Sequence, residues 1–385
     1  MTTNARGRPR VTFVAHEIHD GGGMERAMAE LVRHAALDWD ITLIVRRVAP
    51  SLRPFVVWRR VRVPARPAPL SIAAFALAAG VTLRQHRGEL VHCLGAVVPN
   101  RADLASVHYL HAVVPADTRS GPEVSAARRA NSFVAHWCGL LLERWCYRPA
   151  RLRRFAAVSP AIADDLATAY PGIPVTVTPN GVDAARFARA LADRAELRAR
   201  EGVGDDVVLL FVGGNWAHKG LGLAIRALGR LAAAGARARL WVVGRGDSAP
   251  YRRLAQECGV GDRVTFLGFR ADPEHWYGAA DVFVMPSRSE TFCIAAFEAA
   301  AAGLPLVMTD VGDVGVLVRD GSGGRLVEAD VDQLADALQD YVGDAGRRIA
   351  DGEAARARAS AYTWDASAAS VVAVYRELLG IDACA

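Results

Sequence analysis

The stretch GAADVFVMPSRSETFCIAAFEAAAAGLPLVMTD, residues 278–310, contains two short apolar runs on either side of an alanine-rich segment. The runs DVFVMPS and PLVMTD are typical of buried strands. Between them, FCIAAFEAAAA has the length and composition of a mostly buried helix that ends at Gly303 and Pro305. A strand, a helix and a second strand in this order predict a βαβ unit with parallel strands. The helix carries one carboxylate, Glu298, which needs a partner there unless it faces water.

The same alternation of strand-like runs with alanine-rich helical segments fills the chain, in two series that are not sequence repeats. The first series includes VTFVAH (11–16), DITLIVR (40–46), ELVHCL (89–94), LASVHYLH (104–111) and FAAVSP (155–160). The second series starts after residue 200 and includes VVLLFVGG (207–214), ARLWVVG (238–244) and RVTFLGF (263–269). This pattern predicts an α/β protein with two Rossmann-like, doubly wound parallel-sheet domains that face each other across a ligand cleft.

The turn-rich segment TPNGVD, residues 178–183, is the natural boundary between the two series. We therefore expect an N-terminal domain over residues 1–180 and a C-terminal domain over residues 181–360. The amphipathic segment TWDASAASVVAVYRELLG (363–380) follows the second series. It predicts a C-terminal helix within residues 361–385, which either caps the second domain or crosses back to the first.

The composition, with 385 residues, 52% hydrophobic and 23% charged, is that of a folded protein long enough for two domains. The net charge of +5 permits an anionic ligand or membrane surface, and we expect no nucleic acid. The six cysteines form no C-x-x-C pair and no cluster with histidine, which is typical of a reducing cytoplasm. The segment VTFVAHEIHD is too short and polar for a signal-peptide core, and LSIAAFALAAGVTL (70–83), too short for a membrane span, predicts a core helix.

Three turns at the predicted ends of strands are suited to an anion. HDGGGMERAM (19–28) offers glycine amides at the start of a helix, and FVGGNWAHKGLGLAI (211–225) adds Lys219. In the third turn, the amides of Thr291, Phe292 and Cys293 would lie at a helix N-terminus. Each turn alone could be a flexible loop or a solvated lysine. Together they predict a nucleotide diphosphate.

The motifs FVGG....KG, VTPNGVD and GAADVFVMPSRSETF....FEAAAAGLPLVMTDVG resemble those of the retaining glycosyltransferases of family 4, the group 1 glycosyltransferases. The resemblance extends from residue 11 to about residue 377 and is strongest over residues 178–328. It implies the GT-B fold, in which two Rossmann-like domains bind donor and acceptor. It also implies the transfer of a sugar, a hexose above all, from a nucleotide-diphosphate sugar to a hydroxyl group.

The resemblance assigns roles residue by residue. Glu298 would hold the ribose hydroxyls, Glu290 would lie at the donor sugar, and Lys219 would neutralise the diphosphate leaving group without any metal ion. The donor site as a whole would include Gly22, Gly23, Gly214, Lys219, Arg245, Glu290, Thr291, Phe292, Cys293, Ile294 and Glu298. We expect no metal site and no other cofactor. The strings DWD (38–40) and DVD (330–332) are interpreted as surface turns.

In SVHYLHAVVP (106–115), His108 aligns best with a family histidine near the reacting sugar, where it could bind the donor sugar or assist the acceptor proton. His111 is placed on the acceptor side, and His92 is a weaker candidate. A strand-end histidine can equally be structural. Two departures from the family pattern concern the donor. Gly214 stands where most members carry an arginine, for which Arg245 is a possible substitute, and Thr291 stands where glycine is common.

Arginines dominate two segments of the first domain, RRVAPSLRPFVVWRRVRVPARPAP (46–69) and RWCYRPARLRR (144–154). Basic clusters with aromatic side chains suit an anionic membrane surface or a phosphorylated acceptor, although a solvated face has the same composition. We therefore expect a cytoplasmic enzyme, with contact to the inner face of the membrane left open. Its acceptor would be a lipid-linked, cell-envelope or natural-product glycan precursor.

Two alternatives remain open from the sequence. A glycan phosphorylase or sugar epimerase could use the same architecture, although the chain has no cofactor-lysine motif of the phosphorylase kind. A catalytically silent protein that binds a nucleotide sugar or a glycan is favoured by Gly214 and disfavoured by the retained Glu290, Glu298, Lys219 and His108. The base, the sugar, the acceptor, the linkage and the oligomeric state are not determined by the sequence.

Overall fold

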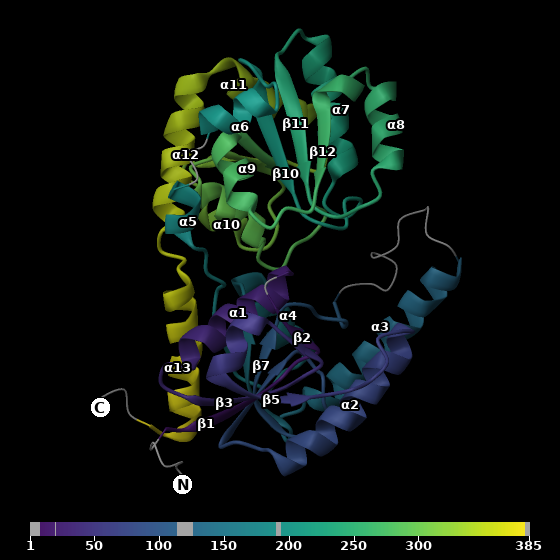
Figure 1. Ribbon diagram of the computed structural model, residues 1–385, viewed down its shortest axis with the longest axis vertical. Coiled ribbons are helices and arrows are strands. Elements are labelled where there is room, and N and C mark those ends of the chain that lie inside the picture. The colour runs from purple at the N-terminus through teal and green to yellow at the C-terminus, as the bar shows by residue number, and fades with distance from the viewer. Residues whose placement is uncertain (1–7, 20, 114–125, 190–193, 382–385) are drawn as a thin grey trace. The chain divides into compact units, whose positions relative to one another are not determined.

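The computed structural model describes residues 8–19, 21–113, 126–189 and 194–381, so Cys384 lies outside the described residues. The chain divides into two compact units, which Figure 1 shows as separate sets of strands and helices. The first unit comprises residues 1–181 and 364–385, and the second comprises residues 182–363. The chain therefore passes between the units twice, at residues 181–182 and at residues 363–364.

The first unit is built on a seven-stranded parallel sheet in the order β5-β3-β1-β6-β7-β8-β9. Its strands are β1 (Arg10–Val14), β3 (Asp40–Val45), β5 (Val56–Arg60), β6 (Leu90–Leu94), β7 (Ala102–Val107), β8 (Leu152–Ala157) and β9 (Val175–Val177). Two short strands, β2 (Glu17–Ile18) and β4 (Arg47–Val48), pair separately. The central strands are buried along their whole length, as expected of a sheet covered on both faces.

The helices of the first unit are α1 (Gly23–Ala35), α2 (Ala68–Gln85), α3 (Ala126–Cys146), α4 (Pro160–Ala169) and α13 (Trp364–Leu379), with the 3-10 turn η1 (Pro50–Phe55). The last helix, α13, packs on α1 and β6 and belongs to this unit. Tyr375 on α13 lies in the core with its hydroxyl 2.6 Å from Nδ1 of the buried His92. Arg154 donates two hydrogen bonds to Glu377, at 2.6 and 2.8 Å.

Helix α2 differs from the predicted core helix. It packs on α3 and buries Phe75 and Leu83, but it leaves Leu70, Leu77 and Val81 exposed. The prediction of a core helix from residues 70–83 was therefore only half right, because one face of α2 has no cover among the described residues. With 18 residues, α2 is long and apolar enough to cross a membrane by length and composition, a test that core helices of soluble proteins also pass.

The second unit contains a six-stranded parallel sheet in the order β12-β11-β10-β13-β14-β15. Its strands are β10 (Val207–Val212), β11 (Ala238–Val243), β12 (Val264–Gly268), β13 (Val282–Met285), β14 (Leu306–Met308) and β15 (Gly324–Leu326). Its helices are α5 (Ala184–Arg189), α6 (Arg194–Arg200), α7 (Leu221–Ala233), α8 (Ala249–Glu257), α9 (Pro273–Ala279), α10 (Ile294–Ala301), α11 (Val331–Gly343) and α12 (Ala345–Ala359), with 3-10 turns η4 (Gly261–Arg263) and η5 (Val314–Val316). The prediction of two doubly wound, parallel-sheet α/β units is confirmed.

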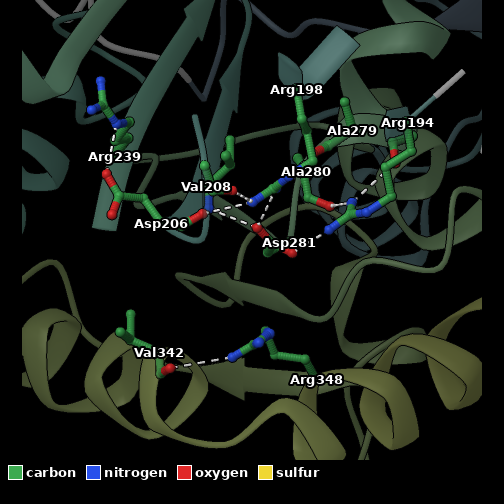
Figure 2. A network of polar contacts seen from close by, with 12 residues as sticks. Arg194, Arg198, Asp206, Val208, Arg239, Ala279, Ala280, Asp281, Val342 and Arg348 are labelled. Carbon is green, nitrogen blue, oxygen red and sulfur yellow. Dashed lines mark hydrogen bonds and ion pairs between the residues drawn. The ribbon is translucent and has the colours of Figure 1, made fainter. Parts of the chain in front are cut away.

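A network of arginines and aspartates fastens α6 to the sheet of the second unit (Figure 2). Asp281, just before β13, pairs with Arg194 and Arg198 of α6 and accepts a hydrogen bond from the amide of Val208 at 2.8 Å. Arg239 on β11 donates to Asp206 at 2.7 Å. Because these charges are mutually paired, they are structural and do not compete for a ligand.

Helix N-terminal capping explains one of the Asp-x-Asp strings. The Asp330 carboxylate accepts hydrogen bonds from the amides of Asp332 and Gln333, so DVD (330–332) begins α11. The interpretation of this string as a plain surface turn was therefore incomplete. An N-cap aspartate satisfies the first amides of a helix and needs no metal ion to account for it.

Candidate functional site

Three turns of the second unit meet beyond the carboxyl ends of β10, β11 and β13. A Cβ atom added to Gly220 would lie 2.1 Å from the carbonyl oxygen of Pro286, and one added to Gly244 would lie 2.0 Å from that of Gly213. Both glycines have positive φ, 77° at Gly220 and 138° at Gly244. A side chain at either position would separate the turns. Ligands of doubly wound sheets bind at this edge.

Lys219 and Glu290 form an ion pair where two of these turns meet. Lys219 Nζ lies 2.5 Å from Glu290 Oε1, which also accepts a hydrogen bond from the Ser287 hydroxyl at 2.9 Å. Burial alone would lower the pKa of Lys219, but the attraction of Glu290 outweighs it and raises that pKa. A Cβ atom on Gly213 would lie 2.6 Å from Lys219 Cδ, so glycine there leaves room for the lysine. Lys219 therefore carries its charge at neutral pH.

The N-terminus of α10 comes directly after Glu290 in the chain. Cys293 caps the helix in the left-handed conformation, with φ 72° and ψ 61°, and Ile294 is the first helical residue. Within the described chain, the amides of Thr291, Phe292 and Cys293 donate to no other backbone group. Burial, and then Glu290, raise the pKa of the Cys293 thiol to about 12, so this cysteine stays protonated. Together with the lysine charge, these amides suit an anion.

Glu298 is buried on α10, at 5% exposure, and is therefore not a solvated helix residue. The Tyr277 hydroxyl on α9 donates a hydrogen bond to Glu298 Oε2 at 3.0 Å and supplies a partner for this carboxylate. The sequence did not indicate Tyr277, which lies 21 residues earlier in an apolar helix. The position of Glu298 thus needs no ligand to explain it, although its other oxygen can accept from a further donor.

The glycine turn of the first unit lies at the N-terminus of α1. Gly22 is the N-cap of α1 and Gly23 its first residue. A Cβ atom on Gly22 would lie 2.2 Å from Oε2 of Glu25, so a carboxylate already reaches this helix N-terminus. Because the Glu25 carboxylate lies at the end of a flexible side chain, it can rotate away when another anion binds.

His108 follows β7 in the first unit and is half-buried. Its Nε2 donates to the side-chain oxygen of Asn180 at 3.4 Å, and its Nδ1 is buried with no hydrogen-bond partner among the described residues. Burial lowers the pKa of His108 to about 4, although the Asn180 bond opposes the shift. The ring is neutral at pH 7, with an unoccupied acceptor nitrogen. Asn180 was not singled out in the sequence, although it lies in TPNGVD.

The other two histidine candidates have structural surroundings. His111 packs on α3, where a Cβ atom on Gly139 would lie 2.2 Å from its Nε2, and its amide donates to the buried Glu143 at 2.7 Å. His92 is fully buried, with Nδ1 against Tyr375 and Nε2 2.8 Å from the Ser106 hydroxyl. Both nitrogens of His92 are satisfied, and burial lowers its pKa to about 3. His92 is therefore a core residue.

Family comparisons agree with this arrangement. Residues 206–344 match the model of glycosyl transferases group 1, and residues 21–186 match that of glycosyltransferase family 4. The D-inositol 3-phosphate glycosyltransferase of Streptomyces griseus is 30% identical over 94% of this chain and 85% of its own length. The chain belongs to the group 1, family 4 glycosyltransferases.

This family member spans only about half the length of some relatives that it matches. The D-inositol 3-phosphate glycosyltransferase of Stackebrandtia nassauensis is 37% identical over 53% of this chain and 49% of that protein. Among solved structures, the lipopolysaccharide glycosyltransferase WaaG has a TM-score of 0.77 at 21% identity, over 94% of this chain and 98% of its own. Anabaena HepE in complex with UDP-glucose has a TM-score of 0.69 at 18% identity, over 97% and 99%. These structures show the GT-B fold.

One departure of this chain from the expected family pattern is Gly214, which stands where the resemblance implies an arginine. It lies beside Arg245, whose carbonyl oxygen is 3.6 Å from a Cβ atom added to Gly214. The Arg245 guanidinium rests 4.3 Å from the centre of the Phe269 ring, and among the described residues it pairs with no carboxylate. Lys219, Glu290, Cys293 and Arg245 thus belong to one set of contacting turns, while Glu298 is held one helical turn further into the unit.

Proposed function

We propose that this chain is a retaining glycosyltransferase that moves a sugar, expected to be a hexose, from a nucleotide-diphosphate sugar to a hydroxyl acceptor. The observation that carries the proposal is the Lys219–Glu290 ion pair at the N-terminus of α10, beside three amides without a backbone partner. The names of its relatives support glycosyl transfer, and the complex of HepE with UDP-glucose supports a nucleotide sugar as donor.

In this proposal the second unit binds the donor through residues that are already in place. Glu298 Oε1 accepts a ribose hydroxyl while Tyr277 holds Oε2. The diphosphate oxygens accept hydrogen bonds from the amides of residues 291–293 and from one N–H of Lys219. Because the Lys219 ammonium has three N–H donors, it can keep its bond to Glu290. Glu290 in turn holds Lys219 at the leaving group, close to the donor sugar. Arg245 supplies the second positive charge that Gly214 removes.

Departure of a nucleotide diphosphate is the step at which negative charge develops, and a fixed cation there stabilises the transition state. The Lys219 ammonium can take this role, which supports a reaction that needs no metal ion. To the first unit we assign the acceptor. The role of Gly22 and Gly23 at the diphosphate rests on the family resemblance. His108 is neutral, and its Nδ1 has no partner among the described residues, so it is the candidate to bind the sugar or receive the acceptor proton. The stereochemical outcome, retention, rests on the family resemblance.

The decisive experiment is calorimetric titration of UDP, GDP, ADP and dTDP, without added metal, into wild type and Glu298→Gln. One nucleotide should bind wild type, and the variant should weaken its binding about tenfold or more, because a carboxylate accepts ribose hydroxyls more strongly than an amide. Tyr277→Phe is the matched control, since it removes the partner of Glu298 but keeps the carboxylate. Equal binding by wild type and Glu298→Gln would reject the ribose assignment.

Gly214 also favours the alternative of a silent nucleotide-sugar or glycan-binding protein, because the site lacks the family arginine there. Release of nucleotide diphosphate separates the two functions. An enzyme releases it in the presence of acceptor, or slowly by hydrolysis, whereas a silent binder retains the donor intact.

For location, we propose a cytoplasmic protein that touches the inner face of the membrane through the outer faces of α2 and α3. These two helices pack side by side and expose large apolar side chains, namely Leu70, Leu77, Val81, Phe133, Val134, Trp137, Leu141 and Trp145. The single described carboxylate on the two helices, Glu143, is buried. Arg148 and Arg151 lie over the Trp145 ring, at 5.0 and 4.0 Å. Apolar and aromatic residues with arginines at the rim suit an anionic bilayer surface.

A further inference from the structure

An open cavity of about 480 Å³ in the first unit is lined by four arginines, one glutamate and four apolar residues. Its walls are Glu17, Arg46, Arg47, Arg60, Val61, Arg62, Val63, Pro64 and Ala65. The volume falls within the range of roughly 300–1,000 Å³ that is typical of small-molecule sites. All of these residues belong to the first unit, and none of them is among the predicted donor residues.

The sheet brings these arginines together. Arg46 follows the last residue of β3 and Arg60 ends β5, and the two strands are parallel neighbours with Val45 opposite Arg60. The amide of Val61 donates to Val45 at 3.0 Å, which continues the pairing past the end of β5. Arg62 then projects to the same side as Arg60, because side chains alternate along an extended segment. The cavity thus lies at the carboxyl edge of the sheet, where doubly wound domains bind ligands.

The charges in the cavity are not balanced. Among the described residues, Glu17 is the single carboxylate in its walls, and it is shared by Arg46 at 3.2 Å, Arg47 at 3.8 Å and His19 at 3.3 Å. Arg60 stacks 5.6 Å from the centre of the Trp58 ring, and among the described residues neither Arg60 nor Arg62 pairs with a carboxylate. Arg46 is fixed by a hydrogen bond to Ser71 at 2.9 Å, and its buried Nε has no partner among the described residues. The walls therefore carry four guanidinium groups and, among the described residues, one carboxylate.

We propose that this cavity binds a phosphate monoester. Guanidinium groups that converge without matching carboxylates repel one another, and an oxyanion with two charges relieves that repulsion. Arginine presents forked N–H donors that match the oxygens of a phosphate, and a monoester offers three such oxygens. The proline- and valine-lined wall, formed by Val61, Val63 and Pro64, leaves room for the organic part of the ester.

This inference rests on the proposed function in one respect: the phosphate is taken to belong to the acceptor, since the acceptor is assigned to the first unit. The acceptor is then a phosphorylated hydroxyl compound, either soluble or carried on a lipid. The two sources share the same phosphate monoester, and the arms of the experiment separate them.

The test uses glycerol 3-phosphate as the soluble probe, glycerol as its uncharged match, and vesicles that contain phosphatidic acid as the lipid probe. Binding to the full chain is measured for wild type, Arg62→Gln and Arg59→Gln. Among the described residues, Arg62 makes no hydrogen bond or ion pair that the substitution would remove. Arg59 is an exposed arginine of β5 that does not line the cavity. Glycerol 3-phosphate should bind wild type and Arg59→Gln alike, and Arg62→Gln should weaken it about tenfold. Glycerol should not bind.

Binding only to the vesicles, with the same loss in Arg62→Gln, would support the phosphate site and assign it to a lipid headgroup. Binding to neither probe, or an equal loss in Arg59→Gln, would overturn the proposal, because general positive charge would then explain it. UDP, GDP, ADP and dTDP are titrated into the same samples. Glycerol 3-phosphate binding without binding of any of these nucleotides would reject the proposed function and keep the cavity assignment. Binding of one nucleotide without glycerol 3-phosphate binding would do the opposite.

Discussion

At the scale of single residues, Lys219 and Glu290 show how a site can be held ready without its ligand. The lysine would otherwise be a half-buried cation without a counter-ion among the described residues, and the glutamate neutralises it until a diphosphate arrives. The same contact fixes the ammonium at the carboxyl edge of the sheet, so little side-chain entropy is lost when the donor binds.

Lys219→Ala should lower kcat about a hundredfold, because one fixed donor to a developing oxyanion is worth that much. It should change stability far less, since Lys219 lies in a turn and holds little of the core. Turnover and urea unfolding are measured on the same preparation. The variant Lys219→Arg serves as the control, because it keeps a positive charge and should recover part of the rate. A loss of folding as large as the loss of turnover would assign Lys219 a structural role.

Whether a site residue could be predicted from the sequence depends on how that residue acts. Lys219, Glu290 and Glu298 occupy positions that a motif fixes, so the sequence indicated that they lie near one site. Tyr277 and Asn180 act through hydrogen bonds to residues far away in the chain, and no local pattern marks such partners. Ser287 lies only three residues before Glu290, but a serine in a turn does not by itself indicate a bond to a glutamate. His92 carries the same strand-end signal as His108, and burial alone separates the core residue from the candidate.

At the scale of elements, apolar periodicity predicted the central strands and the helices between them, because their burial on both faces leaves a clear signal. Strand β5 and helix α3 were not predicted. Half of their residues are exposed, and their arginines and aromatics were interpreted as basic clusters. The packing partner of α13 was also left open, since an amphipathic face does not name the surface that covers it.

The outer faces of α2 and α3 give a prediction at this scale. Wild-type protein should sediment with vesicles of mixed anionic and neutral phospholipid and bind neutral vesicles weakly. The double variant Leu77→Ser with Trp137→Ser should lose most of this binding, because two large apolar side chains no longer enter the interface. Ile349→Ser in the second unit removes an equally exposed side chain, at 63% exposure, and is the matched control. Equal loss in both variants, or dimerisation through this face in solution, would contradict membrane contact.

At the scale of the whole molecule, buried histidines make stability depend on pH. Burial lowers the pKa of His16 to about 4, of His92 to about 3 and of His108 to about 4. The unfolded chain takes up these protons near pH 6.5 and the folded chain does not, so stability is complete above pH 6.5 and is lost toward pH 4. Glu143 changes stability with pH in the opposite direction. Burial raises its pKa to about 7, so its protonation stabilises the folded state as the pH falls.

Each of the three histidines should cost about 1.4 kcal/mol of unfolding free energy per pH unit below 6.5. Urea unfolding of wild type at pH 7.0, 6.0 and 5.0 should therefore show falling stability. Glu143, and below about pH 6 also Asp313, whose pKa burial raises to about 6, each offset one histidine. His92→Gln keeps hydrogen-bonding groups for Tyr375 and Ser106 but cannot titrate, so its slope against pH should be smaller by about one proton. Identical slopes in the two proteins would show that His92 does not titrate between the folded and unfolded states as described.

The position of α13 has a consequence for how the chain is made. The first unit needs Trp364–Leu379 to cover its core, but these residues leave the ribosome only after the whole second unit has been synthesised. At about 5–20 residues per second, the wait is about ten seconds or more. The amino-terminal half must therefore remain incomplete during translation, a situation in which a trigger-type chaperone has time to bind it. A chain that is truncated after the second unit would have a complete second unit and a first unit with an exposed apolar face. Such an exposed face is a target for cellular proteases.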